Sequence, residues 1–168
     1  MNRIVYMVLR HLPIVPYWFW KIDHMGKRHD QYPEQERYDY LRNIIKTINQ
    51  NGRVTVRGYG EEQLPKENGF ILFPNHQGFF DMLAIIDTCP KPLGVIIKKE
   101  AANWILVKQV LRLLGGIPMD RSDIRAAMEV IKEMTRQVKE GKNYVIFPEG
   151  TRSRKGNELL EFKAGTFK

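Results

Sequence analysis

The clearest pattern of hydrophobic and polar positions lies between residues 123 and 140. Apolar side chains recur there every three or four residues, which is the spacing of one face of an α-helix. They are Ile124, Ala127, Met128, Ile131, Met134 and Val138. We expect Ser122 to cap the first turn of this helix and Gly141 to end it.

A second helix is predicted from Pro33 to Gln50. Proline suits the first helical position, and acidic residues follow in the first turn, near the positive end of the helix dipole. Its apolar stripe consists of Leu41, Ile44, Ile45 and Ile48. Gly52 is expected to stop the helix. The pattern alone is compatible with a stripe that faces either a protein core or a bilayer.

From residue 53 onward, short apolar runs alternate with longer helical patterns. The expected strands are Arg53–Tyr59, Phe70–Phe73, Leu93–Ile97, Gly116–Met119 and Tyr144–Phe147. The expected helices between them cover about 80–89, 101–114 and 123–140. This alternation predicts an α/β fold with a mostly parallel central sheet flanked by helices. In such sheets, functional sites form in loops at the carboxyl ends of the strands.

The N-terminal segment is rich in aromatic residues. Residues 4–20 contain thirteen apolar or aromatic residues out of seventeen, but Arg10, His11, Pro13 and Pro16 interrupt them. A spanning helix needs roughly 20 mostly apolar residues, and no small-residue cleavage site follows, so neither a simple transmembrane span nor a signal peptide is expected. Tryptophan and tyrosine beside basic residues favour an interfacial membrane anchor. A helix packed on its own domain by its aromatic face is the alternative.

We therefore predict two parts. Residues 1–50 would form N-terminal interfacial or amphipathic helices that anchor the chain to a membrane, and residues 51–168 would form the α/β domain. The net charge of +8 suits an anionic partner, which could be nucleic acid, phospholipid headgroups or a phosphorylated small molecule. Cys89 is the only cysteine, which excludes an internal disulfide and is typical of a reducing compartment.

The first candidate loop follows the strand predicted at 70–73 and carries His76 and Asp81. His76 is the only histidine beyond residue 29. Five residues on a regular helix correspond to about 140° of rotation, so the two side chains can meet only if the segment begins as a loop and becomes helical later. A neutral imidazole can accept a proton, and a carboxylate beside it fixes the tautomer.

Two further loops carry basic residues. In the loop 115–122, Arg121 lies just before a helix start, where it could bind a phosphate or form a salt bridge with Asp120 or Asp123. The loop 147–155 places two arginines and a lysine beside a glycine. This loop could cradle a phosphate or be a solvated basic turn.

Together these loops resemble the glycerolipid acyltransferase family, which includes the 1-acyl-glycerol-3-phosphate acyltransferases. The motif Asn-His-x-x-x-x-Asp is matched by Asn75, His76 and Asp81, and the Gly-rich strand ending in Asp-Arg by Gly115 to Arg121. Phe147 to Ser153 match Phe-Pro-Glu-Gly-Thr-Arg-Ser without a gap, and Phe162, Lys163 and Gly165 match Phe-Lys-x-Gly. The resemblance covers roughly residues 53–168.

The resemblance implies a role for each matched residue. His76 would deprotonate the acceptor hydroxyl, with Asp81 orienting its ring. The acceptor phosphate would be held by Arg121, Arg152 and one of the pair Lys98 and Lys99, of which Lys99 is favoured. Glu149, Gly150 and Thr151 would shape the acceptor site, with Glu149 also holding the arginines in place. The family needs no metal, and no cofactor is expected.

The resemblance also implies a reaction. A fatty acyl group would pass from the thioester of acyl carrier protein or coenzyme A to the 2-hydroxyl of 1-acyl-glycerol 3-phosphate (lysophosphatidic acid), giving phosphatidic acid. The protein would be peripheral or monotopic at the cytoplasmic face of the cell membrane, on an anionic surface. The alternatives are a glycerol-3-phosphate or other lysophospholipid acyltransferase, or a catalytically silent lipid-binding relative. Family members continue beyond Phe-Lys-x-Gly, so we expect this chain to be truncated at its C-terminus.

Two other function classes fit the residues less well. A serine hydrolase would need a placed nucleophile, but the only serines, Ser122 and Ser153, do not lie in a Gly-x-Ser-x-Gly motif. A nucleic-acid-binding protein would fit the charge, but no known binding module is present. We therefore expect no nucleic-acid partner.

Overall fold

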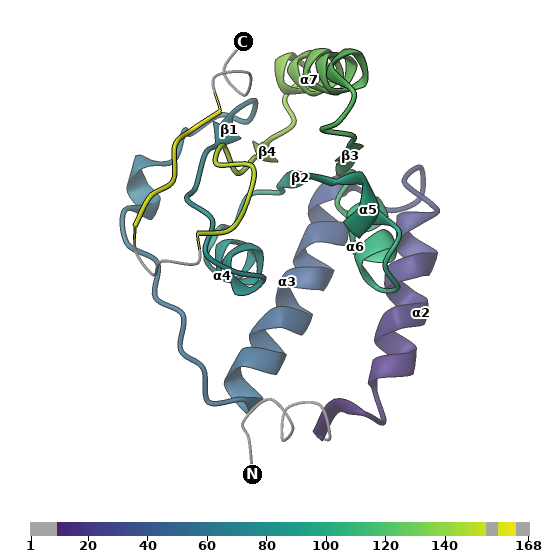
Figure 1. The fold of residues 1–168 in the computed structure, drawn as a ribbon. Coiled ribbons are helices and arrows are strands. Elements are labelled where there is room, and N and C mark those ends of the chain that lie inside the picture. The colour runs from purple at the N-terminus through teal and green to yellow at the C-terminus, as the bar shows by residue number, and fades with distance from the viewer. Residues whose placement is uncertain (1–9, 154–157, 164–168) are drawn as a thin grey trace.

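The computed structural model describes residues 10–153 and 158–163 (Figure 1). The described residues contain a parallel sheet of four strands in the order β1-β4-β2-β3. The strands are β1 (Ile71–Leu72), β2 (Gly94–Lys98), β3 (Ile117–Met119) and β4 (Tyr144–Val145). The helices are α2 (Val15–Gly26), α3 (Glu34–Asn51), η1 (Glu61–Gln63), α4 (Phe80–Thr88), α5 (Lys99–Ala102), α6 (Val107–Leu113) and α7 (Ile124–Lys139). The predicted α/β fold with a parallel, helix-flanked sheet is confirmed.

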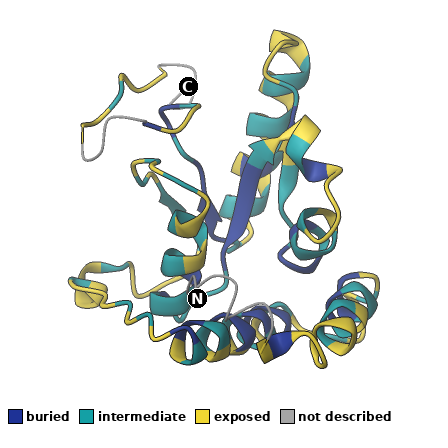
Figure 2. Cartoon of the chain, turned by 60° about the horizontal axis from the view of Figure 1, so that its bottom comes forward, coloured by how far each residue is buried: buried dark blue, intermediate teal, exposed yellow. Residues whose placement is uncertain are grey.

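The sheet is buried on both faces because successive side chains of a strand point to opposite sides. On the two central strands, Val95 and Val145 pack into one core cluster, whereas Ile96, Tyr144 and Ile146 pack into the other. Figure 2 shows these central strands as the buried centre of the molecule. The strands therefore form the middle layer of three.

The larger core lies between the sheet and helices α2, α3, α4 and α6. The stripe predicted on α3 is buried here, which resolves the choice between core and bilayer in favour of the core. Its buried members are Leu41, Ile44 and Ile45, and they share the cluster with Ile86, Leu93, Val95 and Leu113. The helices of the first fifty residues thus contribute to the same core as the α/β part.

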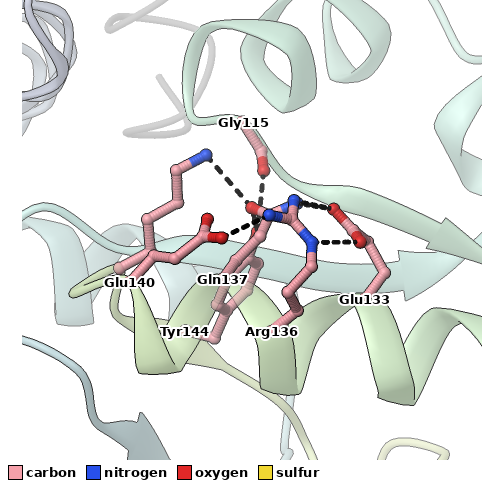
Figure 3. Close-up of polar contacts among 7 residues, drawn as sticks. Gly115, Glu133, Arg136, Gln137, Glu140 and Tyr144 are labelled. Carbon is pink, nitrogen blue, oxygen red and sulfur yellow. Dashed lines mark hydrogen bonds and ion pairs between the residues drawn. The ribbon is translucent and has the colours of Figure 1, made fainter.

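Helix α7 covers the opposite face of the sheet (Figure 1). The hydroxyl of the buried Tyr144 lies 2.6 Å from Gln137 Oε1 and 3.3 Å from the carbonyl oxygen of Gly115, and so links β4 to α7 and to the turn before β3 (Figure 3). Burial raises the pKa of this phenol to about 12. On the outer surface of α7, Arg136 pairs with Glu133 and Glu140 at helical spacing.

The aromatic N-terminal segment is partly packed and partly exposed. Ile22 and Met25 of α2 are buried, and Gly26 allows the helix to approach the backbone of Leu113 closely. Tyr17 and Trp20 are roughly half exposed. The first part of the predicted anchor, residues 4–9, lies outside the described residues. Of the helices in the described ranges, none has the length and apolarity that crossing a bilayer requires.

The prediction of a strand at Arg53–Tyr59 is wrong. This segment is extended but joins no ladder, and it runs along the surface from α3 to η1. Its alternating valines indicated a half-buried strand, but Arg53 adopts a left-handed backbone conformation at φ 54° that turns the chain out of α3. No strand of the described sheet pairs with the segment, so its alternating apolar residues were not enough to make it a strand.

Two helix predictions also need correction. The helix expected at 101–114 is divided into α5 and α6, because the intervening Leu106 has a φ of 73°. The cap of α7 is Asp123, whose carboxylate accepts the N–H groups of Arg125 and Ala126, whereas Ser122 donates to Asp120. Two neighbouring residues could cap this helix, and aspartate is as good a cap as serine.

Candidate active site

All four strands end on the same side of the sheet, and each is followed by predicted site residues. The loop after β1 carries His76, β2 ends at Lys98 and α5 begins at Lys99, the loop after β3 carries Arg121, and the loop after β4 carries residues 149–152. This placement follows from parallel strands joined by helical crossovers, because all carboxyl ends then meet at one edge. The three candidate loops are therefore neighbours in space.

His76 and Asp81 form the pair that the motif resemblance implied, in the loop-then-helix geometry that their spacing requires. His76 lies in a loop, Asp81 is in the first turn of α4, and His76 Nδ1 is 2.8 Å from Asp81 Oδ2. Because an ionised carboxylate can only accept, the proton of the neutral ring lies on Nδ1, and Nε2 keeps its lone pair. Both side chains are partly exposed, so a substrate can reach the ring.

The loop geometry also keeps Asp81 ionised. Its Oδ2 accepts the backbone N–H groups of Gln77 at 2.7 Å and Gly78 at 2.9 Å, in addition to the imidazole. Burial on its own would raise the pKa of Asp81, but the hydrogen bonds from Gly78, His76 and Gln77 favour the charged form and hold the pKa below its ordinary value. His76 therefore has a negatively charged partner, the carboxylate of Asp81, at neutral pH.

The loop after β4 holds the backbone and ring of His76. The His76 N–H donates to Glu149 Oε1 at 2.7 Å, and the His76 carbonyl accepts the N–H of Ser153 at 2.7 Å. The imidazole stacks on the Phe147 ring, with centroids 4.1 Å apart. The motif Phe147 to Ser153 thus fixes the orientation of His76.

Glu149 differs from its expected role. It is 1% exposed, and its second oxygen, Oε2, accepts the N–H of Leu160 at 3.3 Å. Its hydrogen bonds in the described structure go to backbone N–H groups of two other segments, where we expected contacts with the arginines. Sequence reasoning missed this link because His76 and Glu149 are 73 positions apart.

The predicted phosphate-binding residues lie after strands β2, β3 and β4, at the same sheet edge as the histidine. Arg121 Nη1 donates to the carbonyl of Gly150, where the chain turns at a φ of 70°. Lys99 Nζ is 3.4 Å from Asp120 Oδ2, next to Arg121, and Lys98 pairs with Glu100 at 3.1 Å. Lys99, which we favoured over Lys98, thus lies beside the second loop.

Arg152 and Thr151 are both exposed at the end of the loop after β4. The Arg152 guanidinium carbon lies 4.4 Å from the centroid of the Phe79 ring, which is a cation–π distance. Phe79 follows His76 by three residues, so this contact brings a guanidinium to the loop of the histidine. Neither the hydrophobic pattern nor the motifs of the sequence had indicated a role for Phe79.

A cavity of about 300 Å³ opens beside the pair. It is lined by Pro74, Asn75, Gln77, Asp81 and Ile85. Among the described residues, no three histidine, cysteine, aspartate or glutamate side chains are grouped so that they could hold a metal ion. What the arrangement offers chemically is an imidazole oriented by Asp81, at a sheet edge that also carries several basic side chains.

Comparison with known proteins gives this geometry its context. Residues 53–168 match the family profile described as Acyltransferase. The chain belongs to the acyltransferase family. The predicted family resemblance is thereby confirmed, and the matched range agrees with the residues over which we expected it, roughly 53–168.

Several proteins named 1-acyl-sn-glycerol-3-phosphate acyltransferase are similar to this acyltransferase-family chain. It is 34% identical over 109 residues to the 1-acyl-sn-glycerol-3-phosphate acyltransferase of Borreliella burgdorferi, covering 65% of this chain and 43% of the relative. It is 42% identical over 92 residues to the enzyme of the same name from Cocos nucifera, covering 54% and 30%. The chain thus spans less than half the length of these relatives.

A solved structure agrees with the sequence comparisons. The crystal structure of the 1-acyl-sn-glycerophosphate (LPA) acyltransferase PlsC from Thermotoga maritima superposes with a TM-score of 0.71 at 26% identity. The superposition covers 99% of this chain and 69% of that one. The helices before residue 53 are therefore part of the shared architecture as well.

Proposed function

We propose that this protein transfers a fatty acyl group from an acyl thioester to the 2-hydroxyl of 1-acyl-glycerol 3-phosphate. The observation that carries the proposal is the imidazole of His76, fixed by Asp81 through Nδ1 and open at Nε2, at the sheet edge where the basic residues gather. Relatives named 1-acyl-sn-glycerol-3-phosphate acyltransferase in bacteria, plants and human support the choice of acceptor.

The proposed chemistry uses the lone pair of His76 Nε2. It removes the proton from the acceptor hydroxyl as the hydroxyl oxygen attacks the thioester carbonyl carbon. The C–S bond then breaks, the ester forms, and the proton held by His76 passes to the leaving thiolate, so that a free thiol is released. The ring is positively charged between these steps, and the Asp81 carboxylate stabilises it.

The acceptor phosphate is assigned to the basic residues of three loops. Arg121 and Arg152, with Lys99 or Lys98, would bind it as charge-assisted hydrogen-bond donors. Gly150 and Thr151 shape the same site, because the carbonyl of Gly150 positions Arg121. This division leaves the imidazole free to act on the hydroxyl while the cations fix the other end of the glycerol.

We also propose that α2 attaches the protein to the cytoplasmic face of the cell membrane as a peripheral or monotopic anchor. Tyr17 and Trp20 are exposed on the helix, and such rings prefer the headgroup region of a bilayer. The donor would be a thioester of acyl carrier protein or coenzyme A, which reaches the site from the aqueous side. Replacing Tyr17 and Trp20 by serine should reduce binding to anionic liposomes in a flotation assay without exposing the core, and unchanged flotation would contradict the anchor.

An acceptor panel tests the proposed reaction. The protein is assayed with one acyl thioester and with 1-acyl-glycerol 3-phosphate, glycerol 3-phosphate, a lysophospholipid with a larger headgroup, and 1-acyl-glycerol without phosphate. We expect the highest kcat/KM with 1-acyl-glycerol 3-phosphate. Faster turnover of glycerol 3-phosphate would change the acceptor assignment, comparable turnover without phosphate would contradict the role of the arginines, and binding without turnover of any acceptor would identify a lipid-binding relative.

A further inference from the structure

The loop between α5 and α6, residues 103–106, exposes three consecutive large apolar side chains. Trp104 is 53% exposed, Ile105 is 85% exposed, and Leu106 is about half exposed. Single exposed apolar residues are ordinary on a protein surface, but a contiguous group marks a contact surface. The core packing described above does not account for these three side chains.

The backbone of this loop is held in an unfavourable conformation. Leu106 has a φ of 73°, a region that residues with a branched side chain rarely occupy. The Leu106 N–H donates to the side chain of Gln109 at 2.9 Å, which stabilises the turn. A regular continuation of α5 into α6, as the sequence predicted, would avoid this strain. The turn is instead kept, and it interrupts the helix where the apolar side chains are exposed.

The loop lies between the candidate site and α2. The Trp104 ring is 6.2 Å from the ring of Phe79, which is 66% exposed and belongs to the loop of His76. On the other side, Arg112 at the end of α6 pairs with Asp23 of α2 at 3.2 Å. Helices α2 and α6 also pack against each other, so the loop at the start of α6 lies on the same side of the sheet as α2.

The charges around this surface fit an anionic bilayer. Residues 101–111 contain Lys108 and no acidic residue, and residues 10–22 contain Arg10 and Lys21 and no acidic residue, whereas the charge of Arg112 is matched by Asp23. Tryptophan and large aliphatic side chains settle at the boundary of headgroups and acyl chains, with basic residues beside them at the headgroups. An acidic carrier protein would be recognised by basic side chains at the centre of the contact, where this loop is apolar.

We propose that residues 103–106 are a second membrane contact, which inserts Trp104, Ile105 and Leu106 into the interface of an anionic bilayer. With α2 it would hold the site at the membrane surface, so that a lysophospholipid passes Phe79 on its way to His76. This inference extends the membrane attachment proposed for α2 and rests on it. It assigns the loop a function in docking and none in the chemical step.

Vesicle binding of matched variants tests the loop. Ile105→Ser removes an apolar side chain without adding charge, and Ile124→Ser makes the same change at a residue that is 75% exposed at the start of α7, which packs on the opposite face of the sheet. In sedimentation with vesicles containing phosphatidylglycerol, we expect Ile105→Ser to lower the partition coefficient about tenfold, since it removes most of the burial of one aliphatic side chain, and Ile124→Ser to change it less than twofold.

Fluorescence quenching locates the loop directly. In the chain with Trp18→Phe and Trp20→Phe, the remaining Trp104 should be quenched by brominated lipids in anionic vesicles and shift its emission to the blue. A Trp104→Phe variant leaves α2 unaltered, and the part of the quenching that it loses relative to the native chain reports on Trp104. Absence of quenching from a vesicle-bound protein would overturn the loop contact alone, whereas failure of the native chain to bind vesicles would overturn the membrane attachment as well. Weaker binding of acyl carrier protein with unchanged vesicle binding would assign the loop to the donor and also overturn the proposal.

Discussion

The buried carboxyl group of Glu149 accepts the backbone N–H of His76 at 2.7 Å, although 73 positions separate the two residues. The same carboxyl group accepts the N–H of Leu160 and so joins the loop after β1, the loop after β4 and the segment beyond it. Glu149 is therefore a positioning residue for the imidazole in our account, since its contacts go to backbone and not to the space where a substrate would bind.

Replacing Glu149 separates positioning from substrate binding. We expect Glu149→Ala to lower kcat by about tenfold to a hundredfold, since a buried hydrogen bond to a charged group is worth about 1.5–3 kcal/mol. The KM for the lysophospholipid should change little, and Glu149→Gln, which keeps one acceptor oxygen, should recover most of the rate. A raised KM with an unchanged kcat would show instead that Glu149 binds the acceptor.

The ionisation of Asp81 makes a prediction about stability and pH. The pKa of Asp81 is lowered in the folded protein from an ordinary value of 3.8. The folded state therefore binds fewer protons than the unfolded state as the pH falls through this range, so the stabilisation is complete above the ordinary pKa and is lost below it. Urea unfolding of the native chain and of Asp81→Asn should give a difference in unfolding free energy that shrinks as the pH falls from about 5 to below the ordinary pKa of aspartate. A difference that stays constant over this acidic range would contradict the assignment.

Arg121 should act on binding of phosphorylated acceptors. We expect Arg121→Ala to raise the KM for 1-acyl-glycerol 3-phosphate by about tenfold or more, as a charge-assisted contact is lost. Arg121→Lys should restore part of this, since lysine keeps the charge but not the planar group that reaches Gly150. An equal loss of rate with an acceptor that lacks phosphate would indicate that Arg121 only supports the loop.

Gly94 makes a prediction about the fold. A Cβ atom at this position would lie 2.6 Å from the ring of the buried Tyr144 on the neighbouring strand. We expect Gly94→Ala to destabilise the protein by about 1–3 kcal/mol in urea unfolding, because the ring is also fixed by its bond to Gln137. Unchanged stability would mean that β4 can shift without cost.

The sequence predicted most of the sheet and the chemistry at its edge. Four of the five expected strands are present, and the loop-then-helix geometry required for His76 to meet Asp81 is observed. These features depend on local patterns: buried apolar runs, helical periodicity and short motifs. The failures have local causes as well, since the segment at 53–59 lacks a pairing partner and Leu106 adopts a φ that sequence patterns do not reveal.

Contacts between loops could not be predicted in the same way. Nothing in the periodicity near Glu149 indicates that it would turn inward to the His76 N–H, or that Arg152 would lie over Phe79. Such contacts depend on how the three crossovers between the strands bring distant segments to one edge, and on which of several equivalent partners is nearest there. Motif resemblance identified the residues, whereas their partners came from the three-dimensional arrangement.

The central claim is that His76 removes the proton from the acceptor hydroxyl. It is tested most directly by comparing the native chain with His76→Ala for acyl transfer to 1-acyl-glycerol 3-phosphate, with equilibrium binding of that lipid measured in parallel. We expect transfer to fall by about 10²-fold or more while the dissociation constant changes less than threefold, since general base catalysis typically contributes that factor. Transfer at a rate near that of the native chain would contradict the account.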